Sequence, residues 1–249
     1  MDDVIRADGV TAGYGQGPVL ADLSLRVAAG EVVAVAGRSG TGKTTLLRVI
    51  AGRVRPERGT VRVLGGTPAD ARRAKRIGLV AQDALLHPWL TVLGNVELPL
   101  RVNTDADSRA EIEPREWLER VGLGGAARRY PHELSGGMRQ RVALARALVT
   151  APDVLLMDEP LASLDELTRE DLRGEVMDLW AATCCSVLYV THDLDEAVVL
   201  ADRVVVLGGR PARVVGEVAV PVARPRPRRL ARGSELLDAA ESVRALLPG

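Results

Sequence analysis

A glycine-rich stretch, Gly37–Thr45 (GRSGTGKTT), lies between the apolar run Val32–Ala36 and the helical pattern of Leu46–Ile50. Glycine residues allow backbone N–H groups to close around an anion, and a helix that begins there directs its positive end at the same point. In this setting Lys43 would reach the terminal phosphates of a nucleotide, while the Thr44 hydroxyl would complete a Mg²⁺ shell. The stretch therefore predicts a buried strand, a phosphate-binding loop and a helix, in that order. The alternative is an accidental glycine-rich turn.

Lysine is rare in this chain, which supports the phosphate-binding interpretation. Of 33 Lys and Arg residues, only Lys43 and Lys75 are lysines. A compact ammonium fits among phosphate oxygens where a planar guanidinium does not. The use of lysine at position 43 therefore points to a crowded anion site.

The bulk properties exclude several classes of protein. At 249 residues the chain can bury one substantial core, or a core with a subdomain. Its formal net charge is zero and aromatic residues make up 2%, with no Phe, which argues against a nucleic-acid partner and base-stacking surfaces.

Met1–Val4 lacks the features of a signal peptide, and no run approaches the roughly 18 apolar residues of a membrane span. Cys184 and Cys185 lack partners at metal-ligand spacing, so we expect small buried residues at the start of a strand, in a reducing cytoplasm.

Hydrophobic patterning alternates between strand and helix along most of the chain. Strands are predicted at Val4–Ala7, Leu23–Val27, Val32–Ala36, Gly59–Gly66, Ile77–Ala81, Val154–Met157, Val187–Val190, Val204–Leu207 and Val214–Val220. Helices are predicted at Thr91–Val102, Pro114–Val121, Ser135–Leu148, Glu166–Trp180, Leu194–Leu200 and Ser234–Leu247. This alternation predicts an α/β fold with a mostly parallel sheet covered on both faces, into which residues 83–150 insert a helical subdomain.

Two carboxylates follow the apolar run Val154–Met157. Because consecutive strand residues point to opposite sides, Asp158 and Glu159 are expected to do different work. Asp158 suits the outer shell of Mg²⁺, and Glu159 suits polarising a water for attack on the terminal phosphate. A solvated pair of carboxylates is the alternative. The phosphate loop in the same chain favours the catalytic interpretation.

A second anion site is predicted where Ser135, Gly136 and Gly137 open a helix. The sequence there offers a hydroxyl, exposed backbone donors and the positive end of the helix. A plain capped helix would explain Ser135 but not the two glycines, because each costs roughly 1 kcal/mol inside a helix. Two phosphate-seeking helix starts in one chain suggest that the second serves a nucleotide held by another copy.

Together these motifs resemble the ATP-binding subunit of an ABC transporter along nearly the whole chain. Gly37–Thr45 matches the Walker A motif, Leu134–Gln140 the family signature and Val154–Glu159 the Walker B motif. The resemblance implies the P-loop NTPase (RecA-like) fold, a mostly parallel sheet with an N-terminal antiparallel β region and an inserted helical subdomain. It divides a single domain, 1–249, into a nucleotide-binding core at 1–82 and 151–210, the signature subdomain at 83–150 and a C-terminal extension at 211–249.

The same resemblance assigns roles to isolated residues. Gln82 stands where the family has the glutamine that touches Mg²⁺ and meets the membrane partner, and Tyr14 stands where an aromatic ring stacks on adenine. Taken alone, both are equally compatible with ordinary surface residues. The segment Leu161–Asp165 resembles the D-loop, whose Asp165 would cross the dimer, and His192 resembles the switch histidine near the terminal phosphate.

The predicted site thus has three groups of residues. The catalytic residues are Glu159 and His192, and the metal ligands are Thr44, Gln82 and Asp158. The nucleotide-contacting residues are Tyr14, Gly37, Arg38, Ser39, Gly40, Thr41, Gly42, Lys43, Thr44, Thr45, Gln82, Ser135, Gly136, Gly137 and Asp165. By contrast, His87 and His132 are expected to be structural or surface residues. Two positions depart from the family pattern: Ala81 stands where the family usually has Phe, and Leu161–Ala162 stands where it usually has an aromatic residue followed by a small one. These departures affect side-chain packing and not the residues that would bind phosphate.

A narrower similarity, to the nitrate/sulfonate/taurine importer group, is carried by Leu85–Val96, Leu167–Arg169, Leu179–Trp180 and the Arg-Pro tail. It implies ATP and Mg²⁺ as cofactors and a head-to-tail dimer that drives a separate transmembrane permease. It also implies an extracytoplasmic solute-binding protein and a peripheral location on the cytoplasmic face of the membrane. One alternative is a soluble ABC ATPase that acts outside transport, and another is a nucleotide-binding regulatory module without turnover.

Overall fold

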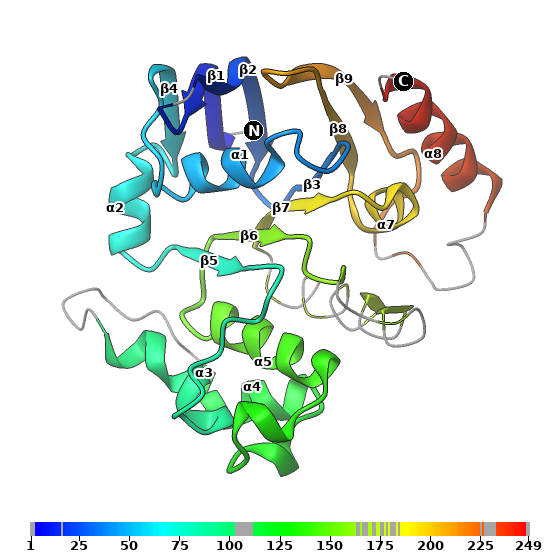
Figure 1. Ribbon diagram of the computed structural model, residues 1–249. Helices are drawn as coiled ribbons and strands as arrows, with labels where there is room; N and C mark the ends of the chain where they lie inside the picture. The colour runs from blue at the N-terminus through cyan, green and yellow to red at the C-terminus, as the bar shows by residue number, and fades with distance from the viewer. Residues whose placement is uncertain are drawn as a thin grey trace.

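A computed structural model describes residues 3–15, 17–102, 112–162, 165, 169–170, 173–174, 177, 179, 183, 185–224, 226 and 233–247. Its strands form two sheets, a three-stranded sheet of order β2-β1-β4 and a six-stranded sheet of order β5-β6-β7-β3-β8-β9. In Figure 1 the three-stranded sheet stands at one end of the molecule, next to the larger sheet, and helices α3, α4 and α5 gather at the opposite end. The expected α/β class is therefore confirmed.

The three-stranded sheet is antiparallel and is built near the N-terminus, as predicted. Its strands are β1 (Asp3–Gly13), β2 (Pro18–Ala28) and β4 (Arg58–Val63). Along β1 the buried positions include Ile5, Ala7, Val10 and Ala12. The register of β1 shifts between Ala7 and Val10, and this bulge restores apolar residues to the inner face. The bulge explains why the alternation in the sequence predicts strands shorter than those observed.

The six-stranded sheet is parallel except at one edge. Its strands are β3 (Val32–Ala36), β5 (Ile77–Val80), β6 (Val154–Asp158), β7 (Ser186–Thr191), β8 (Arg203–Gly208) and β9 (Arg213–Ala219). Strand β9 alone runs antiparallel, against β8. All five residues of β3 and all six of β7 are buried, because a parallel sheet is covered on both faces. This burial explains the continuous apolar runs in the sequence.

Helices cover the two faces of the sheet and pack against one another. They are α1 (Lys43–Ile50), α2 (Pro68–Arg73), α3 (Val92–Arg101), α4 (Pro114–Arg120), α5 (Gly136–Leu148), α7 (Leu194–Leu200) and α8 (Ser234–Leu246), with 3-10 turns at Gly124–Ala126 and Pro131–Glu133. One core joins α1 and the three-stranded sheet to the face that bears Val33 and Val35. The other joins α5, α7 and α8 to the face that bears Val32 and Ala34. Helices α1 and α5 therefore lie on opposite faces of the sheet.

Helix α2 was not predicted from the sequence, although a signal was present. The Thr67 hydroxyl accepts a hydrogen bond from the backbone N–H of Asp70 at 3.2 Å, and Pro68 occupies the first helical position. This is the pattern of a capped helix start. The predicted helix Glu166–Trp180 lies largely outside the described residues, as does Cys184. Cys185 is buried just before β7, as expected.

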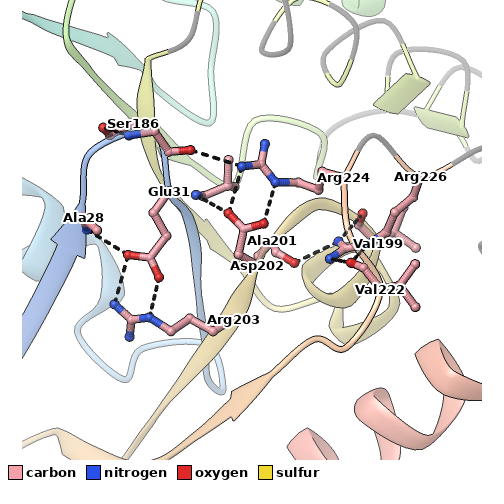
Figure 2. Close-up of polar contacts among 12 residues, drawn as sticks. Ala28, Glu31, Ser186, Val199, Ala201, Asp202, Arg203, Val222, Arg224 and Arg226 are labelled. Carbon is pink, nitrogen blue, oxygen red and sulfur yellow. Dashed lines mark hydrogen bonds and ion pairs between the residues drawn. The ribbon is translucent and has the colours of Figure 1, made fainter. Parts of the chain in front are cut away.

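The C-terminal part of the chain is tied to the amino ends of the parallel strands by arginine side chains (Figure 2). Arg224 forms two 2.8 Å contacts with the Asp202 carboxylate, which also accepts the backbone N–H of Val32 at 2.8 Å. Arg226 is buried and donates to the carbonyls of Val198, Val199 and Ala201 at the carboxyl end of α7. A cation at that point offsets the negative end of the helix dipole.

Across the part of the chain that the structure describes, none of the helices combines the length and the apolar character needed to cross a membrane.

Candidate functional site

Many of the predicted site residues lie at the carboxyl ends of the parallel strands. Strand β3 leads into the glycine-rich loop, β6 ends at Asp158, and β7 ends at Thr191, just before His192. Ligands of α/β proteins bind in the crevice outside this edge of the sheet. The topology therefore brings together residues that are up to about 150 positions apart in the sequence.

The glycine-rich loop has a backbone that only glycine tolerates at several points. Gly40 and Gly42 have φ values of 77° and 90°, in the left-handed region that favours glycine. A Cβ atom at Gly37 would lie 2.9 Å from the carbonyl oxygen of Leu207 and 2.9 Å from Thr41 Oγ1. The Thr41 hydroxyl donates to the carbonyl of Arg38, and Arg38, Ser39 and Gly40 are exposed. The loop thus packs tightly at its base and presents its middle to solvent.

Lys43 is the first residue of α1, and its side chain is only 4% exposed. Its ammonium donates to the carbonyl oxygens of Gly37 at 2.8 Å and Arg38 at 3.2 Å, so it curls back over the loop. The same nitrogen lies 3.4 Å from Glu159 Oε1. A positive charge is therefore held inside the loop, next to a carboxylate.

Thr44 and Asp158 are in direct contact. The Thr44 hydroxyl donates to Asp158 Oδ1 at 3.1 Å and joins the start of α1 to the end of β6. Burial raises the pKa of Asp158, the hydrogen bond from Thr44 lowers it, and the charge of Glu159 raises it, with a raised pKa as the net result. A nearby cation would stabilise the ionised carboxylate.

Glu159 does not continue the strand, which corrects the expectation drawn from strand alternation. Its φ is 45°, a left-handed conformation, and β6 ends one residue earlier. The backbone N–H of Glu159 donates to the carbonyl of Val190 at 2.8 Å, which ties this turn to β7. The two carboxylates do contact different partners, as expected. The cause is the backbone turn at Glu159, however, and not the alternation of strand side chains.

The Glu159 carboxylate links two basic side chains. Oε1 lies 3.4 Å from Lys43 Nζ, and Oε2 lies 2.9 Å from His192 Nδ1. Glu159 is 18% exposed, whereas His192 is 56% exposed and borders solvent. Within the described residues, the structure thus places a carboxylate between a buried ammonium and an accessible imidazole.

Tyr14 lies beside the start of α1. Its hydroxyl is 3.5 Å from Thr45 Oγ1 and accepts a 3.1 Å hydrogen bond from Arg48, while the residue is 53% exposed. Burial raises the pKa of Tyr14, but the hydrogen bonds with Thr45 and Arg48 and the charge of Arg48 lower it below its ordinary value. The sequence reasoning missed Arg48. Its position one helical turn after Thr44 was the available signal.

Gln82 is exposed, two residues after the end of β5. The segment around it is fastened to α5. Gln140 donates to the carbonyl of Ala81 at 3.2 Å, and Arg146 donates to the carbonyls of Ala84 at 2.7 Å and Leu85 at 2.8 Å. Movement of α5 would therefore be transmitted directly to the backbone that carries Gln82.

Ser135, Gly136 and Gly137 open α5 as predicted. The Ser135 hydroxyl accepts from the backbone N–H of Met138 at 3.3 Å, and Ser135 and Gly136 are exposed while Gly137 is buried. Among the described residues, no hydrogen bond or ion pair joins this helix start to Lys43 or Glu159. The structure therefore leaves the second predicted anion site apart from the cluster around Lys43.

Asp165 is exposed, and its carbonyl oxygen accepts from the backbone N–H of Arg169 at 2.9 Å. Ser163 and Leu164, which complete the predicted D-loop, lie outside the described residues. Whether Asp165 crosses to a second copy therefore stays a prediction.

The donor set fits a Mg²⁺ ion that arrives with a nucleotide. Within the described ranges, no group of three or more His, Cys, Asp or Glu side chains is placed to hold a metal ion. Mg²⁺ is bound through one or two protein oxygens together with substrate phosphates and water. The Thr44 hydroxyl and the Asp158 carboxylate supply such a pair next to the glycine-rich loop.

Comparison with known proteins gives consistent relationships. The family described as ABC transporter matches residues 20–162. An aliphatic sulfonates import ATP-binding protein of Pseudomonas aeruginosa is 45% identical over 236 residues, which cover 94% of this chain and 80% of that protein. A taurine import ATP-binding protein of Pelagibacter ubique is 42% identical over 204 residues, which cover 82% of this chain and 76% of that protein. A solved ATP-binding cassette, dimeric and bound to ADP and phosphate after hydrolysis, superposes with a TM-score of 0.76 at 31% identity, covering 88% of this chain and 100% of that one.

Proposed function

The chain belongs to the ABC transporter family, and from this premise we propose how it works as the ATP-hydrolysing subunit of an importer. Each of two ATP molecules would be held between the Lys43 loop of one copy and the Ser135–Gly137 helix start of the other. The observation that carries this proposal is the placement of the two helix starts. Helices α1 and α5 pack on opposite faces of the sheet, so a head-to-tail pair of chains is the simplest way to bring both to one nucleotide.

The residues at the carboxyl edge divide the work on ATP. The N–H groups of Gly37–Thr44 and the ammonium of Lys43 would bind the phosphate chain, while Tyr14 would lie against the adenine. Bound Mg²⁺ would neutralise phosphate charge, held by Thr44, Asp158 and Gln82.

The chemical step would depend on Glu159 and His192. Glu159 would orient a water molecule and accept its proton, and His192 would donate to the terminal phosphate. The contact between Lys43 and Glu159 would have to change when ATP binds. Phosphate oxygens would replace Glu159 as the partner of Lys43, which would leave the carboxylate to act on water.

Transport requires a partner in the membrane, and the surface near Gln82 supports one. Leu85 is 65% exposed and Trp89 is 71% exposed, although both are large and apolar. Exposed apolar side chains that gather together mark interaction sites. We propose that these residues face the permease, which would place the protein on the cytoplasmic face of the membrane.

The names of the relatives suggest the transported class. Because those proteins are named for import of aliphatic sulfonates and of taurine, we propose a small sulfonate as the solute. An extracytoplasmic solute-binding protein would deliver it to the permease. Substrate specificity would then lie in those other chains.

Mixing two inactive variants tests the composite site. Ser135→Arg should still bind ATP through its own loop but fail to hydrolyse it, because a bulky cation would obstruct the partner's nucleotide. Lys43→Ala should fail because its own loop cannot hold the phosphates. In a heterodimer both lesions fall in one site and leave the other intact, so phosphate release should be partly restored.

The matched control mixes Lys43→Ala with Glu159→Gln. Both changes lie on the same half of the site, so each site of that heterodimer keeps one lesion and the mixture should stay inactive. Differently tagged chains would verify that heterodimers form. Full activity of Ser135→Arg alone would contradict the head-to-tail arrangement.

A further inference from the structure

The position of His192 depends on a short stretch of backbone between β7 and α7. Its imidazole is 56% exposed, and its hydrogen bond in the structure is the 2.9 Å contact with Glu159. A side chain with so little packing around it is aimed chiefly by its own backbone. The two residues on either side of it, Thr191 and Asp193, therefore determine where the ring points.

Both flanking residues are bound to Glu196. The Thr191 hydroxyl donates to Glu196 Oε2 at 2.5 Å and accepts from the backbone N–H of Asp193 at 3.0 Å. The Asp193 carboxylate accepts from the backbone N–H of Glu196 at 3.0 Å and so caps α7. Glu196 thus fixes the residue before His192 through its side chain and the residue after it through its backbone.

The Glu196 carboxyl group is buried, with only 3% of the residue exposed. Charged and polar groups face it from several directions: Tyr189 and Thr191 on β7, Asp193 at the helix start and Arg173. Burial raises the pKa of Glu196, and the hydrogen bond from Thr191 and the proximity of Tyr189 oppose that rise. Burying a carboxyl is costly, and an apolar residue would fill the same place more cheaply. The cap of α7 requires only Asp193, so the carboxyl needs another explanation.

We propose that Glu196 is a positioning residue that holds the Thr191–Asp193 turn so that the His192 imidazole faces Glu159. The inference rests on the proposed function for its effect on hydrolysis, but the contact itself is a property of the free chain. Glu196 touches no reacting atom, and it acts through Thr191. Removing the carboxyl should release the turn, while a residue that still accepts the Thr191 hydrogen bond should keep it.

The chain offers a direct spectroscopic test because it has only three histidines, His87, His132 and His192. Imidazole NMR signals of the full-length protein can be assigned by replacing each in turn. Glu196→Leu, which nearly preserves volume, should shift and broaden the His192 signals and leave those of His87 and His132 in place. Glu196→Gln keeps an amide oxygen for the Thr191 hydroxyl and should restore the wild-type signals.

Two further variants separate positioning from general loss of packing. Thr191→Val removes the same hydrogen bond from the opposite side and should reproduce the Glu196→Leu spectrum. The matched control, Val198→Ala, alters a buried residue near the carboxyl end of α7, where its carbonyl accepts from Arg226. It should lower stability without moving the His192 signals. Unchanged His192 signals in folded Glu196→Leu, or equal shifts in Val198→Ala, would overturn the proposal.

Kinetics give the second readout. In Glu196→Leu and Thr191→Val, kcat for ATP should fall about 10- to 100-fold, as expected when a catalytic side chain is displaced by about 1 Å, while the Kd for ATP stays unchanged. Glu196→Gln should recover most of kcat. A kcat equal to the wild-type value in folded Glu196→Leu would count against the positioning role. If the wild-type chain itself releases no phosphate, the proposed function fails, and the NMR comparison still decides the positioning claim.

Discussion

The two ends of the parallel strands carry similar side chains but use them differently. At the amino ends, Arg203 donates to Glu31 at 2.7 Å and Arg224 holds Asp202 with two contacts (Figure 2). Arg203 also donates to Glu217 at 2.8 Å. Burial lowers the pKa of Arg203, but the hydrogen bond and charge of Glu31, together with Glu217, raise it overall. Arg203 and Arg224 are thus each paired with carboxylates.

At the carboxyl ends, the charged groups have contacts that a ligand could replace. Lys43 reaches Glu159 at a longer 3.4 Å, and Glu159 shares its carboxylate with His192. Burial raises the pKa of Asp158 overall, although the hydrogen bond from Thr44 and the charges of Arg48 and Lys43 lower it. The comparison indicates that the ion pairs at the amino ends hold the strands and the C-terminal segment together. The charged groups at the carboxyl ends are instead available to bind an anion and a cation.

The largest expected effect comes from changing the cation at the carboxyl edge. Lys43→Arg should reduce ATP hydrolysis by roughly 100- to 1,000-fold, because a guanidinium is too wide for the space among Gly37, Arg38 and Glu159. The control is Lys75→Arg, at the only other lysine, which lies before β5 and should hydrolyse ATP normally. Steady-state phosphate release checks both. Wild-type activity of Lys43→Arg would contradict the claim that the carboxyl edge serves ATP hydrolysis while the amino edge serves stability.

A smaller effect, on stability, is expected at the amino edge. Arg226→Met should lower the free energy of unfolding by about 2–4 kcal/mol, since the buried carbonyls of Val198, Val199 and Ala201 lose their donor. ATP hydrolysis by the folded fraction should remain. Urea denaturation measures the free energy of unfolding, and phosphate release at low temperature measures ATP hydrolysis by the folded protein. Loss of activity without loss of stability would show that this edge also serves catalysis.

Much of the fold could be predicted because local patterns agree with the final structure. The helix at Leu194–Leu200 was predicted residue for residue, since Asp193 supplies a cap and the apolar spacing is regular. Strand β1 was predicted too short because a bulge between Ala7 and Val10 interrupts its alternation, and β2 because its own register shifts around Asp22, where φ is 51°. Helix α2 was missed because six residues carry too little periodicity.

The site could be predicted where the residue types and spacing of one short motif already indicate which ligand group it binds. The contact between Thr44 and Asp158 follows from two motifs at strand ends, which the parallel topology places side by side. The contact of Glu159 with Lys43 and His192 was not predictable, because it depends on a left-handed turn at a non-glycine residue. The burial of Glu196 was equally hidden, since a glutamate in the first turn of a helix reads as an ordinary helix-start charge.

Glu159 is the residue on which the account of the carboxyl edge depends, and the Glu159→Gln variant tests it most directly. With Mg²⁺ and ATP, light scattering and phosphate release should be measured on one sample of full-length protein. The amide keeps the shape of the side chain but is a poor base, so ATP should bind and hold a dimer. Phosphate release should fall by roughly 100-fold or more. A variant that hydrolyses ATP at the wild-type rate would contradict the role given to Glu159 and, with it, the assignment of the carboxyl edge as the catalytic one.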